Sequence, residues 1–89
     1  MIGRQFVRSA TSIGANVEEA QSAESQADFI HKYAIAQKEA RESLYWLRLI
    51  SESGFVPKQR LSAIMRETEE LHAVITAIIV KAKTRGNEP

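Results

Sequence analysis

Apolar residues recur at alternating intervals of three and four along almost the whole chain, the spacing that puts them on one side of an α-helix. Three segments carry the pattern: Ile2, Phe6, Ala10, Ile13, Val17 and Ala20; then Phe29, Tyr33, Ala36, Ala40, Ser43, Leu47 and Ile50; then Leu61, Ile64, Thr68, Leu71, Ile75, Ile78 and Ala82. The pattern predicts helices at about residues 2–20, 25–53 and 57–84, followed by a short polar tail at 85–89.

Residues that start and stop helices stand at the expected places. Ser25 with Asp28 three residues later resembles a capping box, Gly54 suits a helix end, and Pro57 suits a first turn. Because the connections are short, consecutive helices should be antiparallel neighbours. The predicted fold is all-α: one domain, residues 1–89, forming an up-and-down antiparallel bundle of three long helices, equivalent to three helices of a four-helix bundle.

The helices carry more apolar surface than three of them can cover. The second has an additional stripe through Ile35, Trp46 and Leu49, and residues 74–80 of the third are apolar almost all round. A helix on the outside of a small monomer should not have that pattern. We therefore expect another copy of the chain, or a helix from a partner, to cover an interface that includes Trp46, Leu49, Val74, Ile78, Ile79 and Val80.

Composition excludes several classes of protein. The chain has 89 residues, enough for one domain, and its 12 Lys and Arg nearly balance 11 Asp and Glu, so net charge gives no general attraction to nucleic acid or membrane. Without cysteine it has neither disulfides nor cysteine-bound zinc. The apolar run at 73–80 is too short for a bilayer and the start lacks a signal peptide, so we expect a cytoplasmic protein.

Five basic residues stand near helix ends. Arg4 and Arg8 share a face at the start of the first helix, and Lys81, Lys83 and Arg85 cluster at the end of the third. We expect the two groups to lie near the same end of the bundle and to form a surface that binds RNA or DNA phosphates. The alternative for the second group is that cations simply stabilise a helix C-terminus through the helix dipole.

A polar cluster is expected between the helices. Pairing the first two helices about their turn brings Arg8 level with Glu39, and pairing the last two brings His72 to the same level. The expected members are Arg8, Asn16, Glu19, Glu39, Glu42 and His72. A buried ion pair adds little net stability, so its role would be to fix register. The alternative is that Arg8 and Glu39 are solvated.

Metal binding and catalysis find little support. Asp28/His31 and Glu69/His72 have the acid-x-x-His spacing of di-iron bundles, but the antiparallel register separates the two histidines by ~12 Å. No serine has a His and acid pattern beside it. We expect no metal, no cofactor and no catalytic residue, and we expect the aromatic residues Phe29, Tyr33, Tyr45 and Trp46 to be packing groups.

Two blocks of residues resemble a known family. The first runs Gly3-Arg4-Gln5, Arg8, Ala10, Ser12-Ile13, Asn16 and Glu19; the second runs Ser25, Asp28-Phe29-Ile30, Ile35-Ala36, Lys38-Glu39-Ala40, Glu42 and Tyr45-Trp46-Leu47. In this order and spacing they resemble the bacterial four-helix-bundle proteins known as 23S rRNA intervening-sequence proteins. Members of that family usually have another helix before the Gly-Arg-Gln segment, and this sequence begins inside that junction.

The resemblance implies a ring-like homo-oligomer, often a pentamer, with nucleic-acid contacts and no enzyme activity. Together with the residue pattern it favours a non-enzymatic, oligomeric bundle protein that touches RNA or DNA through a basic end. The alternative is a protein-interaction module that is completed by a helix from a partner or another copy.

Overall fold

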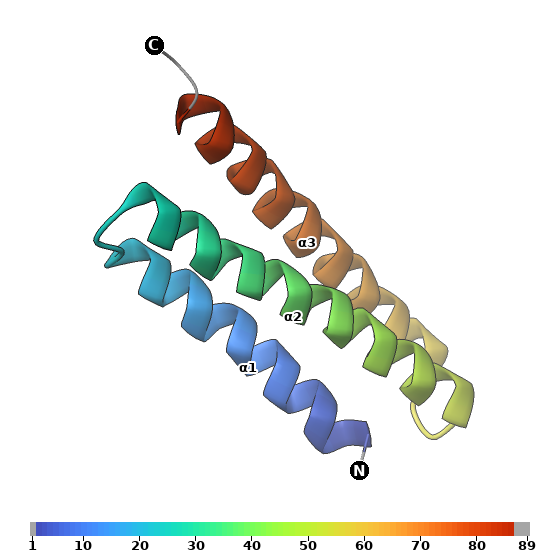
Figure 1. Cartoon of the computed structure of the whole chain (residues 1–89). Helices are drawn as coiled ribbons and strands as arrows, with labels where there is room; N and C mark the ends of the chain where they lie inside the picture. Colours follow the sequence, from blue (N-terminus) through green and yellow to red (C-terminus); the bar gives the residue numbers. More distant parts are fainter. Residues whose placement is uncertain (1, 87–89) are drawn as a thin grey trace.

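The computed structural model describes residues 2–86, which form three helices: α1 (Ile2–Gln21), α2 (Gln26–Ser53) and α3 (Lys58–Gly86) (Figure 1). The prediction of an all-α bundle of three long helices is confirmed, and the helix bounds agree within two residues. One detail differs, because α3 continues to Gly86 and Arg85 is helical rather than part of a tail. The rest of the predicted tail lies outside the described residues.

The boundaries of α2 have the predicted causes. The Ser25 side chain accepts a hydrogen bond from the Asp28 backbone N–H at 3.0 Å, which satisfies one of the donors left free at a helix start. Gly54 ends the helix in the left-handed conformation, with φ of 76°, and its N–H donates to the Ser51 carbonyl. Only glycine adopts that conformation without steric cost, so the chain turns here into α3.

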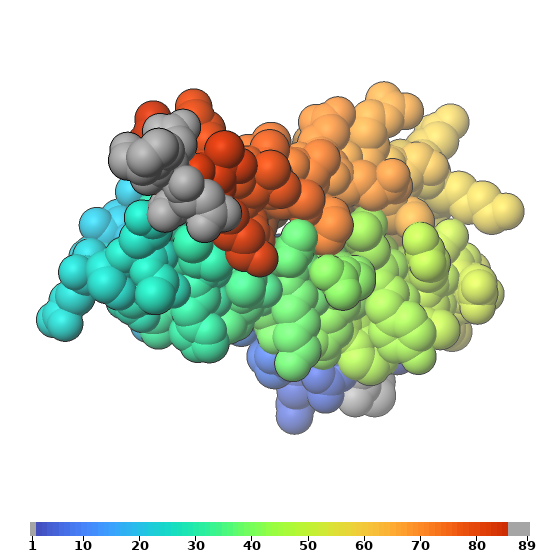
Figure 2. All heavy atoms as spheres, turned by 45° about the horizontal axis from the view of Figure 1, so that its top comes forward, coloured from blue at the N-terminus to red at the C-terminus, as the bar shows by residue number. Residues whose placement is uncertain are grey.

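The three helices do not form a closed bundle. α2 packs against both neighbours, whereas no Cα of α1 lies within 8 Å of a Cα of α3 among the described residues. The molecule measures 52 × 19 × 14 Å. Three helices in a flat layer would be only about 5 Å thick at the level of Cα atoms, and three in a triangle would all touch. The helices therefore occupy three corners of a square, with α2 at the middle corner (Figures 1 and 2).

A small core joins the helices along α2. Its buried members come from all three helices: Ile13, Ala20, Tyr33, Ala36, Ala40, Ile75 and Ile79. Ala36 and Ala40 are completely buried, and their small side chains leave room for the isoleucines of both neighbours.

The contact face of α3 differs from the predicted stripe. Ile64 and Leu71 are each 40% exposed, while Ile79 is buried. Met65 and His72, one position after the predicted residues, are partly buried instead. A helix turns 100° per residue, so Leu61 and Ile75 of the predicted stripe stay at the contact with α2, while Ile64 and Leu71 lie on its flank.

Candidate functional site

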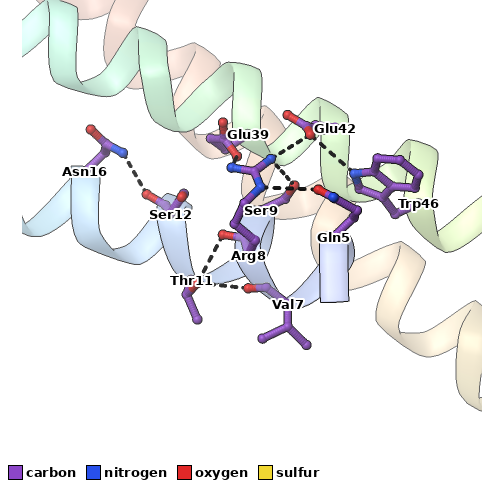
Figure 3. Close-up of polar contacts among 10 residues, drawn as sticks. All are labelled: Gln5, Val7, Arg8, Ser9, Thr11, Ser12, Asn16, Glu39, Glu42 and Trp46. Carbon is purple, nitrogen blue, oxygen red and sulfur yellow. Dashed lines mark hydrogen bonds and ion pairs between the residues drawn. The ribbon is translucent and has the colours of Figure 1, made fainter. Parts of the chain in front are cut away.

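Arg8 joins α1 to α2 near the middle of the bundle (Figure 3). Its Nη2 donates to Glu42 Oε1 at 2.6 Å and to Ser9 Oγ at 3.1 Å, and its Nη1 lies 3.4 Å from Glu39 Oε2. Trp46 Nε1 donates to the same Glu42 oxygen at 3.3 Å. The predicted pairing of Arg8 with Glu39 and Glu42 is thus present in the structure, and Ser9 and Trp46 extend it.

The electrostatics of this group fix α1 against α2. Glu39 is largely buried, and its Oε2 makes no hydrogen bond with the described residues, so Arg8 balances its charge through the ion pair alone. The hydrogen bond from Trp46 and then the contacts with Arg8 hold the pKa of the Glu42 carboxyl below its ordinary value. Arg8 thus lies between two carboxylates of α2, and the lowered pKa of Glu42 favours its charged, ion-paired form.

Three other members of the predicted cluster do not join this group by a hydrogen bond or an ion pair among residues 2–86. Asn16 donates to the Ser12 carbonyl of its own helix. Glu19 pairs with Lys32 at 2.9 Å, further along the same α1–α2 contact, and this contact raises the pKa of Lys32. The Nε2 of His72 is buried and has no hydrogen-bond partner among residues 2–86. The cluster is thus smaller than expected, and the described part of α3 makes none of its hydrogen bonds or ion pairs.

The expectation of one basic end is wrong. Arg4 lies in the first turn of α1 and Arg8 near the middle of the bundle, whereas Lys81, Lys83 and Arg85 lie at the end of α3, at the opposite end of the molecule from the start of α1 (Figure 1). An odd number of antiparallel helices necessarily puts the first and last segments at opposite ends. Arg8 is also engaged by Glu39 and Glu42, so it is not a free cation.

A shallow cleft of about 310 Å³ lies where the start of α2 meets the end of α3. Its floor includes the Phe29 ring and Ile78, and the exposed residues Lys81 and Arg85 flank it. The Gln26 side chain donates to the Ala82 carbonyl and ties the two helices together there. The combination of an apolar floor and two cations suits an anionic group that has an apolar part.

The apolar flanks of α1 and α3 that face each other are only partly covered. The Glu19–Lys32 and Arg8–Glu42 ion pairs mark one flank of α1, and the hydrogen bond between Gln37 and Thr76 marks one flank of α3. Their opposite flanks face the unoccupied fourth corner of the square. We call this surface the open corner: Phe6, Ala10 and Val17 of α1 with Ile64, Leu71 and Ile78 of α3.

The residues expected at an oligomer interface are divided among three environments. Val74 and Val80 are more than half exposed, and Trp46 and Leu49 are partly buried. Ile78 packs against the core from its edge, and Ile79 is only 7% exposed. Ile79 therefore belongs to the core of its own chain, because it lies one turn after Ile75 on the face that contacts α2.

One surface was missed from the sequence. Lys38, Arg41, Tyr45 and Arg48 are all exposed on α2, and Tyr45 is 53% exposed rather than packed in the core as expected. Their spacing of three, four and three was a readable signal, since it repeats the apolar pattern of α2 on the opposite side of the helix.

The described residues contain neither a cluster of metal-binding side chains nor a helix that could span a membrane. Nowhere in residues 2–86 do three His, Cys, Asp or Glu side chains gather closely enough to hold a metal ion. None of the three helices, as described, combines the length and the apolar character that crossing a bilayer requires.

Comparison with known proteins agrees with this architecture. A solved structure of a protein of unknown function from the S23 ribosomal protein family of Bacteroides thetaiotaomicron VPI-5482 superimposes with a TM-score of 0.86 at 40% sequence identity. The match covers 89% of this chain and 73% of that chain. No curated protein matches. The family model described as 23S rRNA-intervening sequence protein matches residues 1–77. The chain therefore belongs to the 23S rRNA-intervening sequence protein family.

Proposed function

We propose that this protein is a non-enzymatic assembly protein whose open corner receives a helix from another copy of the same chain. The observation that carries the proposal is the arrangement of α1 and α3: among residues 2–86 their Cα atoms nowhere come within 8 Å of each other, although their facing flanks are apolar. Ile64 and Leu71 are each 40% exposed, and Val74 beside them is 55% exposed. A fourth helix laid between α1 and α3 would cover these side chains.

A helix that binds in the open corner must be several turns long for the complex to be stable. Covering the exposed parts of Ile64, Leu71 and Val74 contributes roughly 2–3 kcal/mol. Association costs at least about 4 kcal/mol in lost translational and rotational freedom. Contact along the whole corner, including the α1 flank, is needed to exceed that cost, which favours a helix of several turns over a short peptide.

The molar mass in solution, measured by light scattering, tests this proposal. We expect the natural protein to be oligomeric, and Leu71→Glu to reduce the mass because it puts a charge in the open corner. Val80→Glu is the matched control, since Val80 is exposed outside the open corner of α3. Circular dichroism of both variants shows whether the helices remain folded.

A molar mass that remains that of a monomer at high protein concentration would contradict the proposed homo-oligomer. The alternative function, an interaction module completed by a partner, would then be supported by a stoichiometric helical protein whose binding is lost in Leu71→Glu and kept in Val80→Glu. A mass that falls equally in both variants would place the interface outside the open corner.

Nucleic-acid binding is a second candidate function, favoured by the cations at the end of α3. Lys81, Lys83 and Arg85 are exposed, and two of them flank the cleft over Phe29. Affinity for RNA or DNA should fall steeply with salt if these cations contact phosphates. Changing all three to alanine should weaken binding; no binding of the natural protein at low salt would remove this function.

A further inference from the structure

The outward side of α2 carries a row of basic residues around one tyrosine. Lys38, Arg41, Tyr45 and Arg48 follow one another at intervals of three, four and three, and all four are exposed. From Lys38 to Arg48 the row advances by ten residue steps, or ~15 Å along the helix. We call it the α2 outer face.

This face points away from the rest of the molecule. The side of α2 that holds Ala36, Ala40 and Leu47 is buried by α1 and α3, and the α2 outer face lies opposite to it. In the space-filling view α2 forms the middle of the visible surface, with α3 above it and α1 largely behind (Figure 2). The open corner is on the buried side, so a helix that fills the corner leaves the α2 outer face exposed.

Its cations are not neutralised by neighbouring acids. Among residues 2–86, Lys38, Arg41 and Arg48 make no ion pair. The two acids nearest in sequence are already engaged, because Arg8 holds both Glu39 and Glu42. Three free cations along one side of a helix therefore create a local positive potential in a chain whose net charge is only +1.

Tyr45 is presented at the centre of these cations. Tyr45 is 53% exposed, and its ring meets that of Trp46 edge-on, with ring centroids 5.0 Å apart and an interplanar angle of 67°. Trp46 is itself held by its hydrogen bond to Glu42. An aromatic ring that is supported on one side and open on the other can stack against a flat ligand.

We propose that the α2 outer face binds single-stranded nucleic acid. Lys38, Arg41 and Arg48 contact successive phosphates, and an unpaired base stacks on Tyr45. A row of cations with an aromatic ring among them is how proteins bind single strands without reading sequence. Bases inside a duplex are already stacked and cannot reach Tyr45, so a duplex makes only the phosphate contacts.

This inference rests on the nucleic-acid part of the proposed function and assigns it to a different surface. The experiment is fluorescence anisotropy of a labelled, unstructured 20-nucleotide RNA, titrated with the full chain at several salt concentrations. The test variants are the triple change Lys38→Gln, Arg41→Gln, Arg48→Gln and the single change Tyr45→Leu. The matched control replaces three exposed cations at the start of α3: Lys58→Gln, Arg60→Gln, Arg66→Gln.

We expect the α2 triple variant to lose at least tenfold in affinity at low salt and to reduce the slope of log K against log salt by about 2, since each phosphate contact contributes about 0.7. Tyr45→Leu should lose about fivefold or more with an unchanged slope, because stacking is not an ionic contact. The control triple should lose less than threefold. A duplex of the same sequence should bind more weakly than the single strand.

Different contrary results would contradict different parts of the proposal. If the natural protein does not bind RNA at low salt, the nucleic-acid function and this inference both fall. If only the Lys81, Lys83 and Arg85 variant loses affinity, the function stands and the α2 outer face is overturned. Equal losses in the test and control triples, or equal affinity for duplex and single strand, also overturn it.

Discussion

On the α1 side of α2, small and polar residues are buried beside Ile13, whereas on the α3 side all the buried residues are large and aliphatic. Ser9 and Ala20 of α1 are almost completely buried, and two sets of ion pairs, centred on Arg8 and on Lys32, cross to α2. On the other side Leu61, Ile75 and Ile79 provide the buried surface, with the hydrogen bond from Gln37 to Thr76 beside them.

The difference shows how one helix can hold two neighbours with different specificity. Ion pairs and hydrogen bonds are directional, so they select one register of α1 on α2. Aliphatic packing is less selective, because a rotated helix still buries apolar surface. α3 is also the helix whose apolar positions extend beyond its contact face, at Ile64 and Leu71. We therefore expect α3 to supply stability and α1 to supply register.

The largest effect is expected from Ile75→Ala. Ile75 is 1% exposed at the centre of the α2–α3 contact, so its truncation leaves a cavity and should lower the free energy of unfolding by about 2–4 kcal/mol. Urea denaturation at fixed protein concentration measures the loss. Val80→Ala, on the same helix, 59% exposed and outside the open corner, is the control and should cost under about 1 kcal/mol. Equal losses at the two positions would mean that this face is not the one that holds α3.

Overpacking the α1 side should have the next largest effect. Ser9 has no exposed surface, so Ser9→Leu must push α1 away from α2 and should cost about 1–3 kcal/mol. Val7→Leu, on the exposed side of α1, should leave the urea midpoint unchanged. If Ser9→Leu were neutral, the close approach of α1 and α2 would not be a requirement of the fold.

Much of the fold could be predicted because its causes are local. The three-and-four spacing gave the helices, and Ser25 and Gly54 gave the boundaries of α2, since capping depends on residues within one turn. The pairing of Arg8 with Glu39 followed from counting back from the turn between α1 and α2. Each of these steps needs only the chain and the geometry of a helix.

The contact face of α3 could not be predicted in full, because the spacing of apolar residues fits two neighbouring faces of the helix. Ile64 and Leu71 repeat every seven residues, as do Met65 and His72 beside them, and a polar His72 gave no reason to prefer the second set. Packing against α2 decided between them. The position of Lys81 and Arg85 relative to Arg4, by contrast, was predictable from the sequence. In a bundle of three antiparallel helices the start of the first helix and the end of the third lie at opposite ends.

A smaller effect is expected from the Arg8 group. Arg8→Ala leaves the largely buried Glu39 carboxylate without its partner and should cost about 1–2 kcal/mol, moderated because Arg8 is half exposed. Glu39→Gln added to Arg8→Ala should recover part of the loss, since it removes the unpaired charge. A double-mutant cycle from urea denaturation measures this coupling. Strictly additive losses would mean that the pair does not contribute to holding α1.

The smallest effect should appear as a pH dependence at Glu42. Because the pKa of Glu42 is lowered in the folded protein, mainly by the hydrogen bond from Trp46, its charged form favours folding. That contribution is present above the ordinary carboxyl pKa of about 4.3 and is lost as the pH falls through the lowered value. The difference in urea midpoint between the natural protein and Glu42→Gln should therefore shrink between pH 7 and pH 3. Glu18→Gln removes an exposed carboxylate from α1 and is the control for the change in net charge. A difference for Glu42→Gln that stays constant with pH would show that Arg8 and Trp46 hold this side chain by shape and hydrogen bonding rather than by its charge.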